Sequence, residues 1–167
     1  LSGCGGSKSA SKNGKILTIE EGPDVETIDP ALNQAADGAN YITMLSDNLL
    51  RLDKDGKIAP SLAEKYEVSD DGLTWTFHLR DGLKWSDGSA LTANDFVYSW
   101  QRMVDPEVAA PYAETMLGMV EGYKDAIGNP DANGNTTTTP DVTKLKVEAP
   151  DDKTLVVHMS HPTPYFE

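Results

Sequence analysis

The stretch that decides the fold reads LTWTFHLR and occupies residues 73–80. Apolar and polar side chains alternate along it, so Trp75 and Phe77 share an apolar face while the side chains between them are polar. A period of two is typical of a strand with one buried face. The Asp-Gly pair at 71–72 is a favoured turn sequence, and residues 66–69 form a candidate strand on its other side. The stretch therefore predicts an antiparallel hairpin.

Downstream of the hairpin, an amphipathic helix is predicted from Thr92 to Val104. The Thr92 hydroxyl can accept hydrogen bonds from the first free N–H groups, and Asp95 stands three residues later, a variant of the capping box. From Phe96 onward, apolar residues recur at i, i+1, i+4, i+7 and i+8, which gives one apolar stripe. The Asp-Pro pair at 105–106 ends the helix, because a residue before proline disfavours the helical conformation.

The remaining elements have weaker signals. Gly118 and Gly122 each weaken a helix over 115–127 by about 1 kcal/mol relative to alanine, and Gly128 is suited to cap its end. Together, the patterns predict an α+β fold, an antiparallel sheet with two or three packed helices. The other expected segments are a strand over 15–20, a short helix over 40–50, a strand and tight turn over 50–58, a polar loop over 129–141, and strands over 143–148 and 154–159.

Composition narrows the classes of function. The chain has 167 residues, which predicts one domain on a prior of ~150 residues each. Its 14 basic and 27 acidic residues give a net charge of −13, which repels phosphate and argues against nucleic-acid binding. No run of ~18 apolar residues is present, so no membrane-spanning helix is expected. Because the strand over 15–20 has no obvious local partner and the chain ends without a capping element, we expect it to be a fragment of a larger protein.

The N-terminal segment holds the single cysteine, Cys4, which cannot form an intramolecular disulfide or a cysteine-rich zinc site. Residues 1–4 read LSGC, and small residues before a lone cysteine resemble a bacterial lipobox. That resemblance implies cleavage before Cys4 and lipid on its sulfur and amine, since two or more acyl chains give stable anchoring. Residues 5–14 are rich in glycine and serine and predict a flexible tether. The alternative is an unmodified thiol in a disordered terminus.

Candidate metal-binding and acid–base groups have simpler structural explanations. His78, His158 and His161 could bind zinc, but the last two lie in and just after a predicted strand without helical spacing. We therefore interpret the histidines as solvent-facing or hydrogen-bonded. The paired carboxylates at 70–71 and 151–152 fall in predicted turns, where aspartate hydrogen-bonds its own backbone.

Two segments faintly resemble calcium-binding loops. Residues 53–56 (DKDG) lead to Glu64 at the twelfth position but to Ile58 where the loop needs glycine, and residues 131–135 (DANGN) lead to Val142 at the twelfth. A hairpin is the favoured interpretation of both segments, with an adventitious weak site as the alternative for the second. The sequence has no glycine-rich phosphate loop, Gly-x-Ser-x-Gly elbow or Cys–His nucleophile, so we expect no enzyme, no cofactor and no metal site.

Three blocks of sequence carry a family resemblance. They read PSLAEKY at 60–66, LTWTFHLRDGLKWSDG at 73–88 and LTANDFVYSW at 91–100. In this order they closely resemble the family 5 extracellular solute-binding proteins of ABC importers, the dipeptide and oligopeptide receptors, and in particular the oligopeptide-binding members. The resemblance covers essentially everything from residue 15 onward, with shorter matches at 105–106, 110–113, 152–155 and 162–166.

The resemblance implies a domain organisation. Family members are roughly three times this length and have two large lobes plus an N-terminal accessory domain, in a class II periplasmic-binding-protein-like fold. On this basis residues 1–14 are the end of a lipoprotein signal and a tether, 15–44 are the first segment of lobe I with its first strand, and 45–167 are the accessory domain. The remainder of lobe I and all of lobe II would be absent from this chain.

Three tryptophans match framework positions of the family. Trp75 and Trp100 also fall on the apolar faces of the predicted strand and helix, and Trp85 lies between two Asp-Gly turns. We expect all three to be structural residues, with Trp75 and Trp100 in the core.

The resemblance also implies where a ligand binds. The family encloses an extended peptide between closing lobes and holds it by main-chain hydrogen bonds, as in strand addition. The matching positions follow the Asp-Pro pair at 29–30, and Tyr112 matches a tyrosine near the ligand, with packing at a helix edge as its alternative role. Gln34 stands where better-known members have glutamate. The candidate peptide-binding residues are Asn33, Gln34, Ala35, Ala36 and Tyr112.

The implied function is that of the lipid-anchored substrate-binding component of an ABC peptide importer. Such a protein, expected to be a monomer on the outer face of the cell membrane (periplasm or Gram-positive surface), captures oligopeptides and delivers them to the transmembrane permease subunits. The expected partners are therefore peptide, permease and, through Cys4, the membrane. The alternatives are a receptor of the same family for dipeptides, nickel complexes, haem or sugars, and a surface adhesin or signalling module on this fold.

Overall fold

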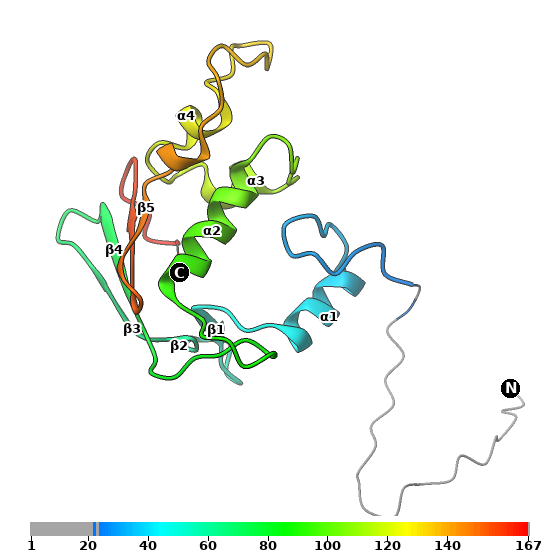
Figure 1. Cartoon of the computed structure of the whole chain (residues 1–167), viewed down its shortest axis with the longest axis vertical. Coiled ribbons are helices and arrows are strands. Elements are labelled where there is room, and N and C mark those ends of the chain that lie inside the picture. Colours follow the sequence, from blue (N-terminus) through cyan, green and yellow to red (C-terminus); the bar gives the residue numbers. More distant parts are fainter. Residues whose placement is uncertain (1–21, 23, 167) are drawn as a thin grey trace, which may run out of the picture.

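The structure is a computed structural model that describes residue 22 and residues 24–166. Figure 1 shows a β-sheet on one side, helix α2 across it, and helix α1 beyond α2 on the side away from the sheet. The strand expected over 15–20, the tether over 5–14 and Cys4 lie outside the described residues, so these expectations stay predictions. None of the helices that the structure describes is long and apolar enough to cross a membrane.

The main sheet confirms the expected hairpin and the antiparallel arrangement. Its four strands, each antiparallel to its neighbour, run in the order β3 (Ala63–Val68), β4 (Thr74–Leu79), β6 (Thr154–His158) and β5 (Val147–Asp151). The turn between β3 and β4 forms because the Asp71 carboxylate accepts a hydrogen bond from the Leu73 N–H at 3.0 Å and Gly72 adopts a φ of +71°. A local Asp-Gly signal therefore sets the register of the central hairpin.

The alternation in β4 produces the hydrophobic core. Trp75 and Phe77 are only 4% and 3% exposed, and Tyr66 of β3 stacks on Trp75 with ring centroids 5.6 Å apart. Phe166 links sheet and helix, because its ring meets Trp75 at 5.4 Å and Trp100 of α2 at 6.0 Å, both edge-on. Aromatic pairs in this geometry contribute beyond their buried area. The packed positions expected for Trp75 and Trp100 are confirmed.

The third tryptophan, Trp85, is 49% exposed and lies outside the core. Its N–H donates to the Ser89 carbonyl at 2.9 Å, and its carbonyl accepts from the Gly88 N–H at 2.9 Å. These bonds close the expected turn at the Asp-Gly pair. The backbone of Trp85 therefore forms the hydrogen bonds of the turn, while its indole is half exposed to solvent.

Helix α2 (Ala93–Val104) matches the expected bounds. The Thr92 N–H donates to the Asp95 carboxylate at 2.7 Å, which is half of the capping box expected from the sequence. Asp105 follows the last helical residue in an extended conformation. The apolar stripe of α2 packs across β5 and β6, so the helix covers the buried face of the sheet (Figure 1).

The helix expected over 115–127 is in fact two short helices, α3 (Ala113–Leu117) and α4 (Tyr123–Ile127). Gly122 separates them with a φ of +78°, and a Cβ there would lie 2.0 Å from the Lys144 carbonyl oxygen. Only glycine allows this backbone conformation and this approach. Gly128 ends α4 with a φ of +93°, as the sequence predicted.

The prediction of a strand over 143–148 is wrong for its first half. Residues Val142–Lys144 form a 3₁₀ turn, η1, and β5 begins only at Val147. The Asp141 side chain accepts a hydrogen bond from the Thr143 N–H at 3.1 Å, which stabilises the turn in place of a strand. The strand expected over 154–159 is confirmed as β6.

The N-terminal described segment contains α1 (Ala36–Leu45), which begins and ends earlier than the helix expected over 40–50. Leu49 is not helical, because its carbonyl accepts hydrogen bonds from the Ser61 and Ala63 N–H groups at 3.1 and 3.0 Å. A small second sheet follows, the antiparallel hairpin of β1 (Leu50–Leu52) and β2 (Ile58–Pro60). The α+β class is confirmed, with two antiparallel sheets and four α-helices in the described residues.

Candidate functional site

The segment that precedes α1 begins with a tight turn at Asp29. The Asp29 carbonyl accepts hydrogen bonds from the Leu32 and Asn33 N–H groups at 3.1 and 3.0 Å, and its carboxylate accepts one from the Ala31 N–H at 2.9 Å. Aspartate followed by proline favours such a turn, because aspartate can bond its own backbone two residues on. The turn delivers the chain to the candidate residues at 33–36.

The Asn33 side chain makes its contacts within this segment and with the start of α1. Its Nδ2 donates to the Ala35 carbonyl at 2.9 Å, and a Cβ placed on Gly38 would lie 2.0 Å from its Oδ1. Its side chain therefore fills the space between the turn and the first turn of α1, and it is half-buried there. The Asn33 side chain therefore holds the segment, and because its N–H already bonds to the Asp29 carbonyl, only its main-chain carbonyl is left for a ligand.

The next three residues are exposed. Ala35 is extended, with φ −116° and ψ 147°, and α1 begins at Ala36. Within the described part of the chain, neither the N–H nor the carbonyl of Gln34 is hydrogen-bonded to another residue. The N–H and carbonyl of Ala35 already bond to Asn33 and Ala39, so Gln34 supplies the open main-chain groups that can hydrogen-bond to a second chain.

Arg102 of α2 holds this segment from the other side. Its two terminal nitrogens donate to the two carboxylate oxygens of Asp29, at 3.2 and 2.6 Å. The side chains are 29% exposed for Asp29 and 35% for Arg102, so the pair is half-buried. The hydrogen bonds from Arg102 lower the pKa of Asp29, and the same contact raises the pKa of Arg102. Sequence analysis missed this pair, since nothing local connects two residues in separate elements.

Tyr112 lies immediately before α3, with its side chain exposed to solvent. Among the described residues, no hydrogen bond or ring contact joins it to the segment at 33–36. In the described part of the chain, hydrogen bonds therefore do not link Tyr112 to the other four candidate residues. Cys4, the candidate lipidation site, lies outside the described residues.

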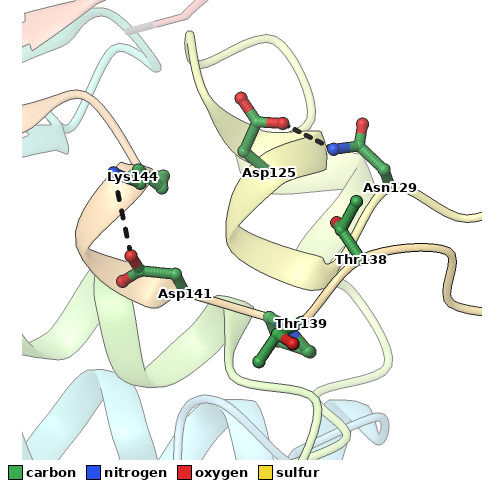
Figure 2. A pocket seen from close by; sticks show the side chains of 7 residues that line it. Asp125, Asn129, Thr138, Thr139, Asp141 and Lys144 are labelled. Carbon is green, nitrogen blue, oxygen red and sulfur yellow. Dashed lines mark hydrogen bonds and ion pairs between the residues drawn. The ribbon is translucent and has the colours of Figure 1, made fainter.

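An open pocket of about 450 Å³ lies elsewhere, between α4, η1 and the loop at 138–141 (Figure 2). Its carboxylates are already engaged: Asp125 accepts from the Asn129 side chain at 2.5 Å, and Asp141 lies 3.9 Å from the Lys144 ammonium. The hydrogen bond from the Thr143 hydroxyl lowers the pKa of Asp141, so that group is ionised at neutral pH. None of the candidate residues lines this pocket.

A second, apolar pocket of about 370 Å³ lies over the edge of the aromatic core. It is lined by Tyr66, Val68, Trp75 and the Pro162 to Pro164 segment, together with Gly72. Within the described residues, the indole Nε1 of Trp75 is buried without a hydrogen-bond partner. This pocket contains none of the candidate residues either.

The groups considered for metal or acid–base chemistry are separated. His158 lies 3.5 Å from a threonine hydroxyl on β4, His161 lies 2.9 Å from a serine hydroxyl, and His78 lies 3.7 Å from a glutamate on β3. The described part of the chain contains no group of three or more histidine, cysteine, aspartate or glutamate side chains that could hold a metal ion.

The two segments that faintly resemble calcium loops are turns. Asp53 accepts hydrogen bonds from two N–H groups of its own turn at 2.8 and 2.9 Å, and Asp131 accepts two at 2.8 Å each. The paired carboxylates at 70–71 lie in a turn, and Asp151 ends β5 just before the turn at 152–153; Asp71 and Asp151 each accept a hydrogen bond from the backbone N–H two residues on. The turn interpretation of these acidic residues is confirmed.

The segment before α1 is exposed at residues 34–36, and the Asp29 carboxylate beside it is bound to Arg102 of α2. The model of the bacterial extracellular solute-binding proteins, family 5, Middle, matches residues 57–167. The chain belongs to this family. The family consists of solute-binding proteins, which are not enzymes, and this confirms the expectation from the sequence.

Two curated relatives share about the same sequence identity with the chain. The chain is 39% identical over 150 residues to the periplasmic oligopeptide-binding protein OppA of Haemophilus influenzae, and 40% identical over 153 residues to that of Escherichia coli K12. The crystal structure of the Haemophilus influenzae protein in complex with the peptide RPPGFSPFR superposes with a TM-score of 0.76, covering 87% of this chain and 27% of that one. The fold class and the family resemblance expected from the sequence are both confirmed.

The match is partial in length. It covers 89% and 91% of this chain but only 26% of each of the two curated proteins. The chain therefore spans about a quarter of the length of the relatives it matches.

Proposed function

We propose that this chain is the N-terminal part of the substrate-binding component of an ABC peptide importer, which captures extended oligopeptides and delivers them to the permease. The observation that carries the proposal is the 39% identity and the TM-score of 0.76 to a protein whose crystal structure contains a bound peptide. In this proposal, residues 15–44 begin lobe I and residues 45–167 form the accessory domain.

The segment at 33–36 is the proposed point of contact with the peptide backbone. Gln34 has unpaired main-chain groups among the described residues, and Ala35 is extended, so the segment offers hydrogen bonds to a peptide without selecting its side chains. Tyr112 is proposed to contact the ligand from the start of α3. Because the Gln34 side chain is uncharged, it adds no ion pair to a peptide amine.

The remaining parts of the proposal concern location. A lipid on Cys4 and the tether at 5–14 are proposed to hold the protein on the outer face of the cell membrane, where a monomer docks on the permease subunits. Two or more acyl chains suffice for stable anchoring. Replacing Cys4 by serine is expected to release the protein from the membrane fraction, and retention of that variant in membranes would contradict the anchor.

A second candidate is a receptor of the same family for a different small solute. The chain is 36% identical over all of its 167 residues to a dipeptide-binding protein of Lactococcus lactis. It is also 40% identical over 152 residues to a probable deoxycholate-binding periplasmic protein of Escherichia coli K12. Sequence identity over this chain therefore does not distinguish a peptide receptor from a bile-acid receptor.

Calorimetry on the complete solute-binding protein that contains this chain separates the two candidates. Titration with a tri- to nonapeptide library, with RPPGFSPFR included, and with deoxycholate compares both ligand classes directly. Heat from peptides only, together with peptide in the eluate by mass spectrometry, supports peptide capture. Absence of both contradicts it. The 167-residue chain alone is expected to bind peptide poorly, because enclosure requires two lobes.

Main-chain recognition has its own test at Gln34. Proline at this position removes the N–H donor, so Gln34→Pro is expected to weaken peptide binding, whereas Gln34→Ala keeps the donor and should bind as the wild type does. A peptide N-methylated at the amide that would donate to the Gln34 carbonyl should also lose affinity, which tests the second main-chain hydrogen bond. Equal affinity of Gln34→Pro and Gln34→Ala for unmodified peptide would show that this backbone group is not used.

A further inference from the structure

Arg102 makes the one ion pair, among the residues that the structure describes, that joins the segment before β1 to the rest of the fold. Its partner, Asp29, is 73 positions away in the sequence, so the contact is tertiary and not part of a local turn. The pair is bidentate, with N–O distances of 2.6 and 3.2 Å. Two parallel charge-assisted hydrogen bonds fix the direction of a carboxylate as well as its distance.

Asp29 passes this restraint to the turn that follows it. The carboxylate oxygen that Arg102 contacts at 3.2 Å also accepts the Ala31 N–H at 2.9 Å, and the Asp29 carbonyl accepts two further N–H groups, the second from Asn33. A displacement of the carboxylate therefore displaces the turn.

Asn33 carries the restraint from the turn to the start of α1. Its side chain donates to the Ala35 carbonyl at 2.9 Å, and Gly38 lies so close that a Cβ there would be 2.0 Å from the Asn33 Oδ1. Groups packed this tightly transmit a displacement because no space is left to absorb it. An unbroken series of contacts thus runs from α2 through Asp29 to the exposed backbone around Gln34.

We propose that Arg102 is a positioning residue for the peptide-binding segment at 33–36, and that its pair with Asp29 fixes the exposed backbone of that segment relative to α2. The inference rests on the proposed function, since it concerns the same segment. Arg102 does not itself contact the peptide in this proposal. A segment held in its binding conformation loses less entropy when a ligand binds, so freeing it lowers affinity without removing a contact.

The test measures peptide affinity and amide hydrogen exchange in the complete protein, with RPPGFSPFR and a pentapeptide library as probes. Arg102→Ala is expected to weaken affinity by up to about fivefold and to speed exchange over residues 29–36, with exchange in β4 unchanged. Arg102→Lys keeps the charge but not the two-pronged geometry, so it should recover part of the affinity. Arg51→Ala removes the same charge from an exposed position in β1 and is the matched control, for which we expect no change in either quantity.

A double variant separates positioning from general loss of stability. Asp29→Asn keeps an oxygen for the Ala31 N–H but removes the charge. If both residues act through one contact, Arg102→Ala causes no further loss of affinity in the Asp29→Asn background. Additive losses overturn the proposal, as does wild-type affinity together with wild-type exchange in Arg102→Ala.

The same experiment distinguishes the two proposals of function and positioning. If the wild-type protein binds no probe, the proposed function fails. Exchange over 29–36 then decides alone whether Arg102 positions this segment: faster exchange in Arg102→Ala supports the role, and unchanged exchange overturns it.

Discussion

The four-stranded sheet and the segment from Asp29 to Leu45 are held in place by different forces. In the sheet, Trp75 is 4% exposed and Leu155 is fully buried, so burial of apolar surface supplies the stabilisation at about 25 cal/mol per Å². The segment exposes most of its large apolar side chains, and the bidentate pair with Arg102 ties it to α2. The stabilisation from apolar burial does not depend on the relative orientation of the side chains. The strength of a bidentate ion pair does depend on that orientation.

The difference separates the residues that control stability from those that control the geometry of the proposed site. A change in the core lowers the free energy of unfolding of the whole unit, because every strand shares that core. A change at the pair with Arg102 alters the place of one segment and leaves the sheet intact. The following predictions test this separation, from the largest expected effect to the smallest.

Substituting alanine for Trp75 is expected to lower the free energy of unfolding by about 3–5 kcal/mol, because it leaves a cavity beside Tyr66 and Phe166. Urea denaturation of the 167-residue chain, followed by circular dichroism, measures the loss. Trp85→Ala is the matched control, with an expected loss of about 1 kcal/mol or less because that indole is half exposed. Similar losses in the two variants would contradict the assignment of the core.

Gly122→Ala is expected to cost about 2–3 kcal/mol, because a Cβ there combines a left-handed backbone with a clash at the Lys144 carbonyl. Gly134→Ala is the control, since its φ is +82° but open space surrounds it. It should cost about 1 kcal/mol from backbone strain alone. Thermal unfolding compares the two variants, and equal shifts in the midpoint would rule out a tight approach between α4 and η1.

Acid is expected to break the pair between Asp29 and Arg102 without unfolding the sheet. The hydrogen bonds from Arg102 hold the pKa of Asp29 below its usual 3.8. The contribution of the pair to stability is therefore complete above pH 3.8 and is lost as the pH falls through the lowered pKa. Since both side chains are about one-third exposed, this contribution is about 1 kcal/mol or less.

An NMR titration of the Asp29 carboxyl carbon checks the expected pKa directly. Its midpoint should lie below 3.8 in the wild type and should rise in Arg102→Ala. A midpoint that stays in place after the substitution would mean that the pair does not form in solution.

The smallest effect is expected at Leu45, at the end of α1. Leu45→Ala should change the free energy of unfolding of the 167-residue chain by about 0.5 kcal/mol or less, because the side chain is 71% exposed. Leu155→Ala, the same substitution in β6, should cost about 2–5 kcal/mol. A large loss at Leu45 would show that α1 is held by apolar contacts and would weaken the contrast between the two regions.

The elements that could be predicted from the sequence are those whose signals are local. The alternation around Trp75 and the turn at Asp71 define the hairpin, and Thr92 with the Asp-Pro pair at 105–106 defines α2, because period, cap and stop agree there. The family itself was recognisable from the blocks at 60–66, 73–88 and 91–100. These signals do not depend on any distant part of the chain.

The errors and omissions share a tertiary cause. Gly122 breaks the expected helix because the Lys144 carbonyl approaches it, and Leu49 leaves the expected helix because Ser61 and Ala63 bond its carbonyl. For the candidate site, the sequence placed the segment at 33–36 after the Asp-Pro turn. It could not pair Asp29 with Arg102, since charge alone does not select one among many acidic and basic residues.

The strand order has a consequence for biogenesis. Thr76 of β4 pairs with Val156 of β6, so the ribosome must translate most of the chain before the central strand acquires its second neighbour. Until then one edge of β4 carries unpaired N–H and C=O groups, which are open to pairing with other chains. At about 5–20 residues per second this interval lasts for several seconds, long enough for a chaperone to shield the growing chain.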